Sequence, residues 1–286
     1  MAEKRFASFE QDQKAVMVVS HERSGTHFAM NALAGCFGYV SYPWVDIEQE
    51  SFNTNFYDAI CMSKILGFLI EKRCASTVKS HHSVEFFEPF LEHLNGPMDV
   101  VYVLRNPVDV MVSFWRFLHT WRWAEGPRTD TAAQFAAAAP MGRLMRYQWR
   151  QHETMLHRWA DHAEGWLKAA SEHPHLHVLR YERMVADYSA TMHELGAAMG
   201  LPVRSDQPPP RDRNVVQVGD RSFTPAPGAD NADAVRDIAA GAAPRGIGLS
   251  LMRWESSPRR VRVGPPADGN HRQAAREGRA SSSSLR

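Results

Sequence analysis

A short loop near the start of the chain combines residue types that bind anions. The segment Arg23–Thr26 (RSGT) follows an apolar run, Ala15–Val19, and precedes a run of helix formers, Phe28–Gly35. Unpaired main-chain N–H groups and the positive end of the helix dipole converge at the start of a helix. Gly25 lets the main chain approach a ligand closely, and Arg23 adds a fixed positive charge. The pattern predicts an anion-binding loop; an ordinary helix cap with an exposed arginine is the alternative.

The loop lacks the residues with which a kinase or an ATPase holds a triphosphate. That signature is G-x-x-x-x-G-K-[ST], in which the lysine reaches the terminal phosphates. Here Gly25 is followed by Thr26, and position 20, five residues before Gly25, is a serine. The sequence therefore favours an anion loop without the triphosphate apparatus, which makes a small-molecule kinase the least favoured function.

A second cation follows a later apolar run. Asp99–Leu104 leads into Arg105 and then Pro107, which suits the first turn of a helix. Ser113 comes eight residues after Arg105, about two turns into that helix. Both side chains could therefore face one anion near the helix start. The alternative for Arg105 is a surface salt bridge with Asp109.

The elements that position these loops alternate between strand and helix. After the first unit, β-favouring Ser76–His82 precedes apolar residues at helical spacing over 86–94, and the run before Arg105 leads into a third helix. We predict a long helix over about Met141–Ala170, a strand over His175–Arg180 and a helix over Tyr188–Gly200. Alternating strands and helices indicate an α/β fold with a parallel central sheet, in which ligands bind beyond the carboxyl ends of the strands.

Four segments, in order along the chain, resemble motifs of the sulfotransferases that use 3′-phosphoadenosine 5′-phosphosulfate (PAPS). Glu22–Phe28 is similar to the first loop of that family and Lys79–His81 to its K-[TS]-H strand end. Val101–Phe114 resembles its 3′-phosphate motif, and Tyr181–Met184 its Y-E-x-M segment. The resemblance covers about residues 15–200. It implies a P-loop NTPase-like three-layer fold, with helices on both faces of the sheet, and transfer of a sulfuryl group from PAPS as cosubstrate.

The resemblance also implies roles for single residues. Arg23 would stabilise the bridging phosphate oxygen of the donor, Lys79 would contact the sulfuryl oxygens, and His81 would be the general base. An imidazole suits that task because its usual pKa is close to neutrality. The implied donor-binding residues are Arg23, Ser24, Gly25, Thr26 and His27 at the 5′-phosphate, Arg105 and Ser113 at the 3′-phosphate, and Phe28 and Tyr181 near the adenine.

Other properties of the sequence limit the partners. The chain has 33 basic and 32 acidic residues, so it has no overall charge for binding nucleic acid, and we expect no nucleic-acid partner. Among its 14 histidines, His152, His157 and His162 are spaced by five. That spacing turns them about 500° on a helix and off a common face, so we predict no metal. The acceptor is expected to be a small molecule, a glycan or a lipid carrying a hydroxyl or amine.

The composition divides the chain into four parts. We predict an N-terminal tail over 1–13, a sulfotransferase-like α/β domain over 14–203, a poorly defined C-terminal extension over 204–253 and a disordered basic tail over 254–286. The late R-K-G-x-x-G-x-W segment of cytosolic family members has only Arg245–Gly248 as its counterpart. A non-catalytic or weakly active nucleotide-binding protein of the same fold therefore stays open as the alternative function.

The cysteines and apolar segments bear on the compartment. Cys36, Cys61 and Cys74 are an odd number and form no C-x-x-C pair, which favours a reducing environment. The first residues contain no apolar stretch typical of a signal peptide, and no apolar run approaches the length of a membrane span. We predict a cytoplasmic protein, and the sequence does not indicate its oligomeric state.

Overall fold

A computed structural model describes residues 14–46, 63–64, 66–67, 76–120, 126–210 and 226–241. The tails predicted for 1–13 and 254–286 lie outside these residues, as does Arg245–Gly248.

The described residues form a five-stranded sheet in the order β2-β3-β1-β4-β5, and every neighbouring pair of strands is parallel. The strands are β1 (Ala15–Ser20), β2 (Val40–Asp46), β3 (Ser76–Ser80), β4 (Met98–Leu104) and β5 (Leu176–Arg180). Every residue of β1 and β4 is buried, because both strands lie inside the sheet and are covered on both faces. The predicted parallel α/β fold is confirmed; β2 was not predicted.

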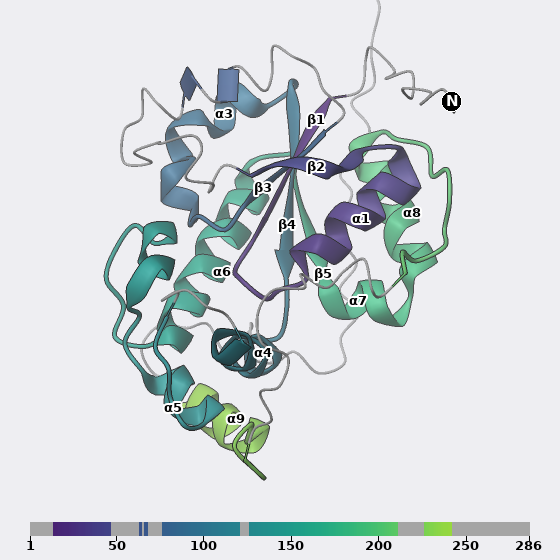
Figure 1. The fold of residues 1–286 in the computed structure, drawn as a ribbon. Helices are drawn as coiled ribbons and strands as arrows, with labels where there is room; N and C mark the ends of the chain where they lie inside the picture. Colours follow the sequence, from purple (N-terminus) through teal and green to yellow (C-terminus); the bar gives the residue numbers. More distant parts are fainter. Residues whose placement is uncertain are drawn as a thin grey trace, which may run out of the picture. The chain divides into compact units, whose positions relative to one another are not determined.

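Helices cover both faces of the sheet, which gives three layers (Figure 1). On one face lie α1 (Thr26–Phe37), α7 (Tyr181–Ala186) and α8 (Tyr188–Met199), and on the other α4 (Pro107–Thr120), α5 (Ala132–Ala137), α6 (Met155–Glu172) and α9 (Ala232–Gly241). Each helical layer buries apolar side chains against alternate residues of the strands, so the sheet separates two hydrophobic cores.

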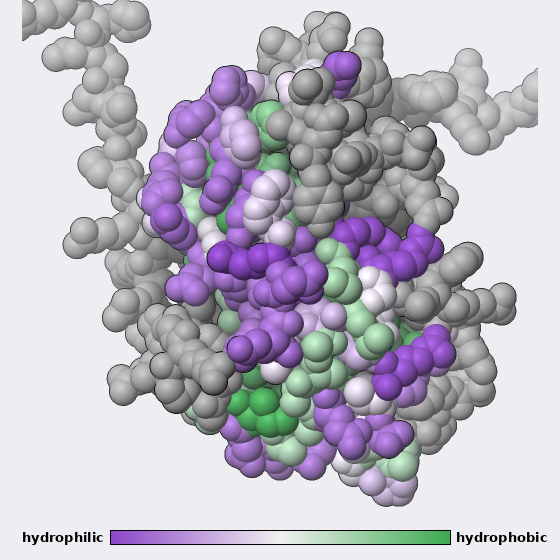
Figure 2. Space-filling view, turned by 90° about the vertical axis from the view of Figure 1, so that its left-hand side faces the viewer, coloured by the Kyte–Doolittle hydropathy of each residue, from purple (hydrophilic) through white to green (hydrophobic). Residues whose placement is uncertain are grey.

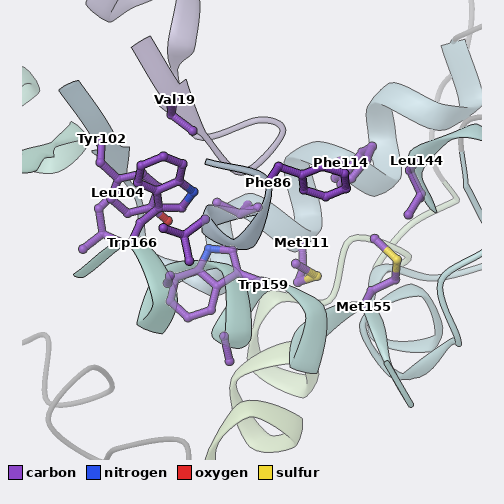
Figure 3. Close-up of a cluster of buried hydrophobic side chains, with 14 of the residues drawn as sticks. Val19, Phe86, Tyr102, Leu104, Met111, Phe114, Leu144, Met155, Trp159 and Trp166 are labelled. Carbon is purple, nitrogen blue, oxygen red and sulfur yellow. The ribbon is translucent and has the colours of Figure 1, made fainter. Parts of the chain in front are cut away.

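The core on the α6 side is rich in aromatic residues (Figure 3). Trp159 and Trp166 of α6 and Phe114 of α4 are each at most 2% exposed, and they belong to the same core as Tyr102 of β4. The ring of Tyr102 stacks on that of Trp166, with the ring centres 5.9 Å apart. Phe114 is therefore a core residue.

Two helix predictions were wrong. The segment predicted as one helix over Met141–Ala170 forms a 3-10 helix, Gly142–Tyr147, and then α6, which begins only at Met155. Thr154 caps α6, because its side chain accepts a hydrogen bond from the main-chain N–H of His157. The segment 86–94 likewise forms two short 3-10 turns, Val84–Phe86 and Glu88–Phe90, followed by α3 (Leu91–Leu94).

The stretch 204–253, predicted to be a poorly defined extension, contributes α9 to the fold. Val235 of α9 is fully buried in the core that α4 and α5 share. The main-chain N–H of Ala132 also bonds to the carbonyl of Ala229, just before α9. Residues after 210 thus pack against α4 and α5 and extend the core on that side, which the sequence did not indicate.

The surface of the described residues is mainly polar. Figure 2 shows hydrophilic side chains over much of the face that carries α3, α5 and α6, with apolar side chains between them. The exposed large apolar side chains of the described part are Val185 in α7, and Met141 and Trp149 on either side of the 3-10 helix Gly142–Tyr147. No described helix is both long and apolar enough to cross a lipid bilayer.

Candidate active site

The loops singled out by the sequence meet at one edge of the sheet. Val19 of β1 is in register with Ser80 of β3, and Ser20 with Val103 of β4. The residues that follow these three parallel strands therefore leave the sheet side by side. They are the loop 21–25, the segment that begins at His81, and Arg105 with the start of α4.

The loop before α1 adopts an unusual backbone. Gly25 precedes the first helical residue with a φ of 97°, and Arg23 has a φ of 67°. A side chain at position 25 would also collide with Tyr181, since a Cβ atom there would lie 2.4 Å from Cδ2 of that ring. Glycine is therefore required at 25, and Arg23 holds a conformation that residues with side chains adopt at a free-energy cost.

The side chain of Arg23 in this loop lies close to two residues of a later segment, Arg105 and Ser113. Arg105 donates from Nη1 to the main-chain carbonyl of Arg23 over 3.1 Å, and Arg23 donates from Nε to the Ser113 hydroxyl over 3.3 Å. Burial, together with the charge of Arg105, lowers the pKa of Arg23 to about 10. In the described part of the chain no carboxylate pairs with either arginine, so the alternative salt bridge between Arg105 and Asp109 is not formed.

Aromatic rings hold both guanidinium groups in place. The guanidinium carbon of Arg23 lies 4.5 Å from the ring centre of Phe117, and that of Arg105 lies 4.4 Å from the ring centre of Tyr181. Tyr181 also makes an edge contact with Phe28. Tyr181 therefore lies between Gly25 and Arg105, the two places where the sequence analysis expected anions.

Two buried polar atoms at the site have no hydrogen-bond partner among the described residues. They are the hydroxyl oxygen of Ser24 and Nε of Arg105. Buried polar atoms are normally satisfied, so such an orphan marks a place for a ligand or for solvent. Two cations without a carboxylate and an unsatisfied hydroxyl fit a ligand that carries phosphate groups.

The ring of His81 is oriented by the end of β1. Its Nδ1 lies 2.8 Å from the main-chain carbonyl oxygen of Ser20. Because a carbonyl only accepts, Nδ1 carries the proton, and the lone pair of the neutral ring is on Nε2. The ring also makes an edge contact with Tyr147. This tautomer is the one that can accept a proton at Nε2.

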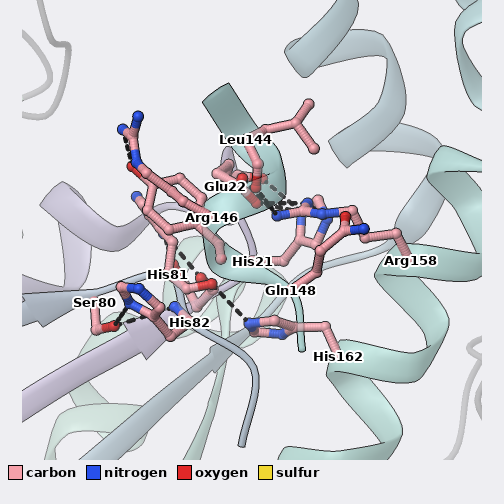
Figure 4. Close-up of polar contacts among 12 residues, drawn as sticks. His21, Glu22, Ser80, His81, His82, Leu144, Arg146, Gln148, Arg158 and His162 are labelled. Carbon is pink, nitrogen blue, oxygen red and sulfur yellow. Dashed lines mark hydrogen bonds and ion pairs between the residues drawn. The ribbon is translucent and has the colours of Figure 1, made fainter. Parts of the chain in front are cut away.

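A buried ion pair, which the sequence analysis missed, anchors the loop to α6 (Figure 4). Arg158 donates from both terminal nitrogens to the carboxylate of Glu22, over 2.7 and 2.8 Å, and from Nη1 to Nε2 of His21 over 2.6 Å. The three residues are at most 7% exposed. The only signal in the sequence was a charged residue on the apolar face of the helix, between Met155 and Trp159.

This ion pair determines the charges of the loop. Burial alone would raise the pKa of Glu22, but the guanidinium of Arg158 holds it well below its usual range. Burial lowers the pKa of His21 to about 3, so its ring is neutral near pH 7. The main-chain carbonyl of Glu22 accepts from Nδ1 of His21, which leaves Nε2 free to accept from Arg158.

The other predicted residues lie around this centre. Thr26 shares a hydrogen bond of 2.6 Å with the Ser20 hydroxyl, and His27 is half-buried in the first turn of α1. Lys79 is 9% exposed and is in register with Val18, on the sheet face that α1 covers. In the described ranges no cluster of histidine, cysteine or acidic side chains is arranged to hold a metal ion.

A family model identifies the family to which the sequence belongs. The model of the sulfotransferase domain family matches residues 13–217. No curated protein matches the sequence. Among solved structures, a mouse sulfotransferase complexed with PAP (adenosine 3′,5′-bisphosphate) is 18% identical, with a TM-score of 0.44, and the match covers 67% of this chain and 60% of that one.

Two further solved structures are similar. Retinol dehydratase in a complex with retinol and PAP is 17% identical over 68% of this chain and 62% of its own, with a TM-score of 0.41. The sulfotransferase domain of the Synechococcus olefin synthase is 14% identical over 86% of this chain and 94% of its own, with a TM-score of 0.45. The chain thus spans about 60% of the length of the first two structures.

Proposed function

The chain belongs to the sulfotransferase domain family, and on this basis we propose that it transfers a sulfuryl group from PAPS to a hydroxyl or amine of an acceptor. The observation that carries the proposal is the meeting of Arg23, Arg105 and His81 at one edge of the sheet. Two cations that no carboxylate of the described segments pairs with lie there beside a histidine whose tautomer suits a base.

The residues around Gly25 and Arg105 would bind the two phosphate-bearing ends of the donor. The main chain at the start of α1 and the side chains of Ser24, Thr26 and His27 would hold the 5′-phosphate. Arg105 would hold the 3′-phosphate, and its unsatisfied Nε supports this role. Ser113 would act there together with Arg105, and its bond to Arg23 supports a link between the two phosphate sites. Phe28 and Tyr181 would pack near the adenine.

The reaction exchanges one bond to sulfur for another. PAPS, when bound, would supply the sulfuryl group: the acceptor oxygen or nitrogen bonds to sulfur, the bond from sulfur to the 5′-phosphate oxygen breaks, and PAP leaves. His81 would take the acceptor proton on Nε2. Arg23 would stabilise the negative charge that develops on the phosphate oxygen. It would act as a fixed charge, because its guanidinium stays protonated near neutral pH. Lys79 would contact the sulfuryl oxygens.

The remaining proposals concern the acceptor and the setting of the protein. We propose a small-molecule, glycan or lipid acceptor, with no nucleic-acid partner and no metal in the reaction. The segment 14–203 would be the catalytic domain. A cytoplasmic location is supported by the free, buried thiol of Cys36.

Incubation with PAPS labelled in its sulfuryl group, together with a panel of phenols, alcohols, sugars and amines, tests this proposal. We expect label on at least one acceptor, transfer that is slower by about 100-fold or more but still measurable in the His81→Ala variant, and equal stabilisation of both proteins by PAP in thermal unfolding. Stabilisation by PAP without transfer to any acceptor would instead identify a non-catalytic nucleotide-binding protein. Stabilisation by Mg-ATP but not by PAP would indicate a kinase.

A further inference from the structure

His162 links a strand of the sheet to the segment that carries the proposed base, and Figure 4 shows its contact with His81. It lies in α6, one turn after Arg158, and is 4% exposed. Its Nδ1 is 3.1 Å from the hydroxyl oxygen of Tyr102 in β4, and its Nε2 is 3.2 Å from the main-chain carbonyl oxygen of His81. Neither contact belongs to the roles proposed above, so the function of His162 needs a separate account.

The direction of both hydrogen bonds follows from the chemistry of the partners. The carbonyl oxygen of His81 can only accept, so Nε2 of His162 must carry a proton. In a neutral ring Nδ1 is then the acceptor, and the hydroxyl of Tyr102 donates to it. The order of donation is therefore Tyr102 to His162 to His81.

The surroundings keep His162 in this neutral form. Burial lowers the pKa of His162 well below its usual value, and the nearby His21 and Arg158 lower it further. The ring of His21 meets that of His162 edge to face, with the ring centres 5.6 Å apart. Burial also raises the pKa of Tyr102, so its hydroxyl keeps the proton that it donates. Both bonds are thus maintained near neutral pH.

We propose that His162 is a positioning residue for His81, an inference that rests on the proposed function. The carbonyl of His81 is held by His162 from α6, while its ring is held by the carbonyl of Ser20 from β1. A residue fixed at both its main chain and its ring has little freedom to rotate away from an acceptor. Misplacement of a reacting group by about 1 Å can reduce a rate about 100-fold, so such an anchor affects turnover.

Two substitutions at position 162 separate positioning from simple packing. The amide of glutamine can place an N–H near the position of Nε2, whereas the shorter asparagine reaches only the position of Nδ1. His162→Asn therefore loses the bond to His81, and His162→Gln keeps it. His175→Asn is the matched control, because His175 is also 4% exposed but lies before β5, at the opposite end of the sheet.

The kinetic experiment compares these variants with the wild type and with His81→Ala. We expect His162→Asn to lower kcat at least tenfold with little change in the KM for PAPS or in the Kd for PAP. His162→Gln should recover most of kcat, and His175→Asn should equal the wild type. In the His81→Ala background His162→Asn should have no further effect, since it acts through His81. Unchanged kcat in His162→Asn, or an equal loss of kcat in both backgrounds, would overturn the proposal.

A second readout does not depend on transferase activity. Diethyl pyrocarbonate modifies accessible neutral histidines, and mass spectrometry of the peptide gives the rate at His81. We expect this rate to rise several-fold in His162→Asn and to stay near the wild-type rate in His162→Gln and His175→Asn. If His162→Asn does not fold, Tyr102→Phe can replace it, because this variant removes the hydroxyl that donates to His162. It should produce a smaller rise in the modification rate at His81. Equal rates at His81 in all folded variants would overturn the inference. If the wild type transferred no sulfate, the proposed function would fail, but the modification rates would still test the inference.

Discussion

The Nη1 atom of Arg105 donates a hydrogen bond of 3.1 Å to the main-chain carbonyl oxygen of Arg23, which brings two cationic residues together at the edge of the sheet. Like charges in a buried place are unfavourable, and the lowered pKa of Arg23, about 10, reflects both its burial and its neighbour. A bound anion would remove this penalty and form charge-assisted hydrogen bonds. The arrangement is therefore more favourable with a phosphate-bearing ligand than without one.

Replacement of Arg23 by glycine should abolish PAP binding without lowering the stability of the fold. Glycine adopts the φ of 67° without the strain of about 1 kcal/mol that other residues carry there, and the repulsion from Arg105 disappears. We expect Arg23→Gly to melt at or above the wild-type temperature in scanning calorimetry and to lose PAP binding. Arg23→Ala removes the same side-chain contacts but keeps the strain, so it should be less stable than Arg23→Gly by about 1 kcal/mol. Equal stability of the two variants would show that the backbone at position 23 is not strained.

The buried ion pair between Glu22 and Arg158 should be sensitive to loss of one charge. Glu22→Gln leaves the guanidinium of Arg158, which is 2% exposed, opposite a neutral amide. We expect a loss of about 3 kcal/mol in the free energy of unfolding, measured by urea denaturation. The double variant Glu22→Gln/Arg158→Met, which removes both charges, should recover part of that loss. A loss below about 1 kcal/mol in the single variant, as for a surface pair, would contradict this account of the anchor.

The buried histidines should make the fold sensitive to mild acid. His21 in the unfolded chain takes up a proton below pH 6.5, whereas in the native state its pKa is about 3. Between about pH 3 and pH 6.5 the unfolded state therefore binds more protons than the native state. The free energy of unfolding decreases as the pH is lowered, by up to about 1.4 kcal/mol per pH unit. The pKa of His162 is also lowered, so this residue adds to the same effect.

Glu22 contributes in a different pH range. Its pKa is lowered in the native state, so its stabilising effect is complete above the unfolded pKa of 4.5 and is lost only as pH falls toward the native value. Between pH 7 and pH 5 the histidines should thus dominate. Urea denaturation at pH 7, 6 and 5 should show falling stability, with a shallower slope for His162→Gln. A slope that is the same in both proteins, or absent in the wild type, would argue against a neutral buried His162.

The features that the sequence predicted correctly depend on local signals. The apolar strand β1 is followed within five residues by Arg23 and Gly25, and β4 is followed directly by Arg105. In a parallel sheet such loops must leave at the same edge, so strand order alone brings them close. The roles suggested for Lys79, His81 and the donor-binding residues remain predictions.

The features that the sequence did not predict depend on contacts between distant positions. Arg158 meets Glu22 across 136 positions of the chain, and Arg23 meets Ser113 across 90. Periodicity does not identify such partners: the charge of Arg158 on the apolar face of α6 indicates that it needs a partner, but not which residue that is. The break before α6 was missed for another reason: Gly142, with a φ of 76°, and the cap at Thr154 outweigh the apolar spacing that favoured one long helix.

Calorimetric titration with PAP and with adenosine 5′-monophosphate tests most directly whether Arg23 and Arg105 hold a donor with two phosphate groups. A charge-assisted hydrogen bond contributes about 1.5–3 kcal/mol, so wild-type protein should bind PAP about 10- to 100-fold more tightly than the monophosphate. Arg105→Leu should abolish that preference, and Arg116→Leu, at an exposed arginine of the helix α4 that follows Arg105, should keep it. No heat on addition of PAP to the wild type, or a preference that survives in Arg105→Leu, would contradict the account.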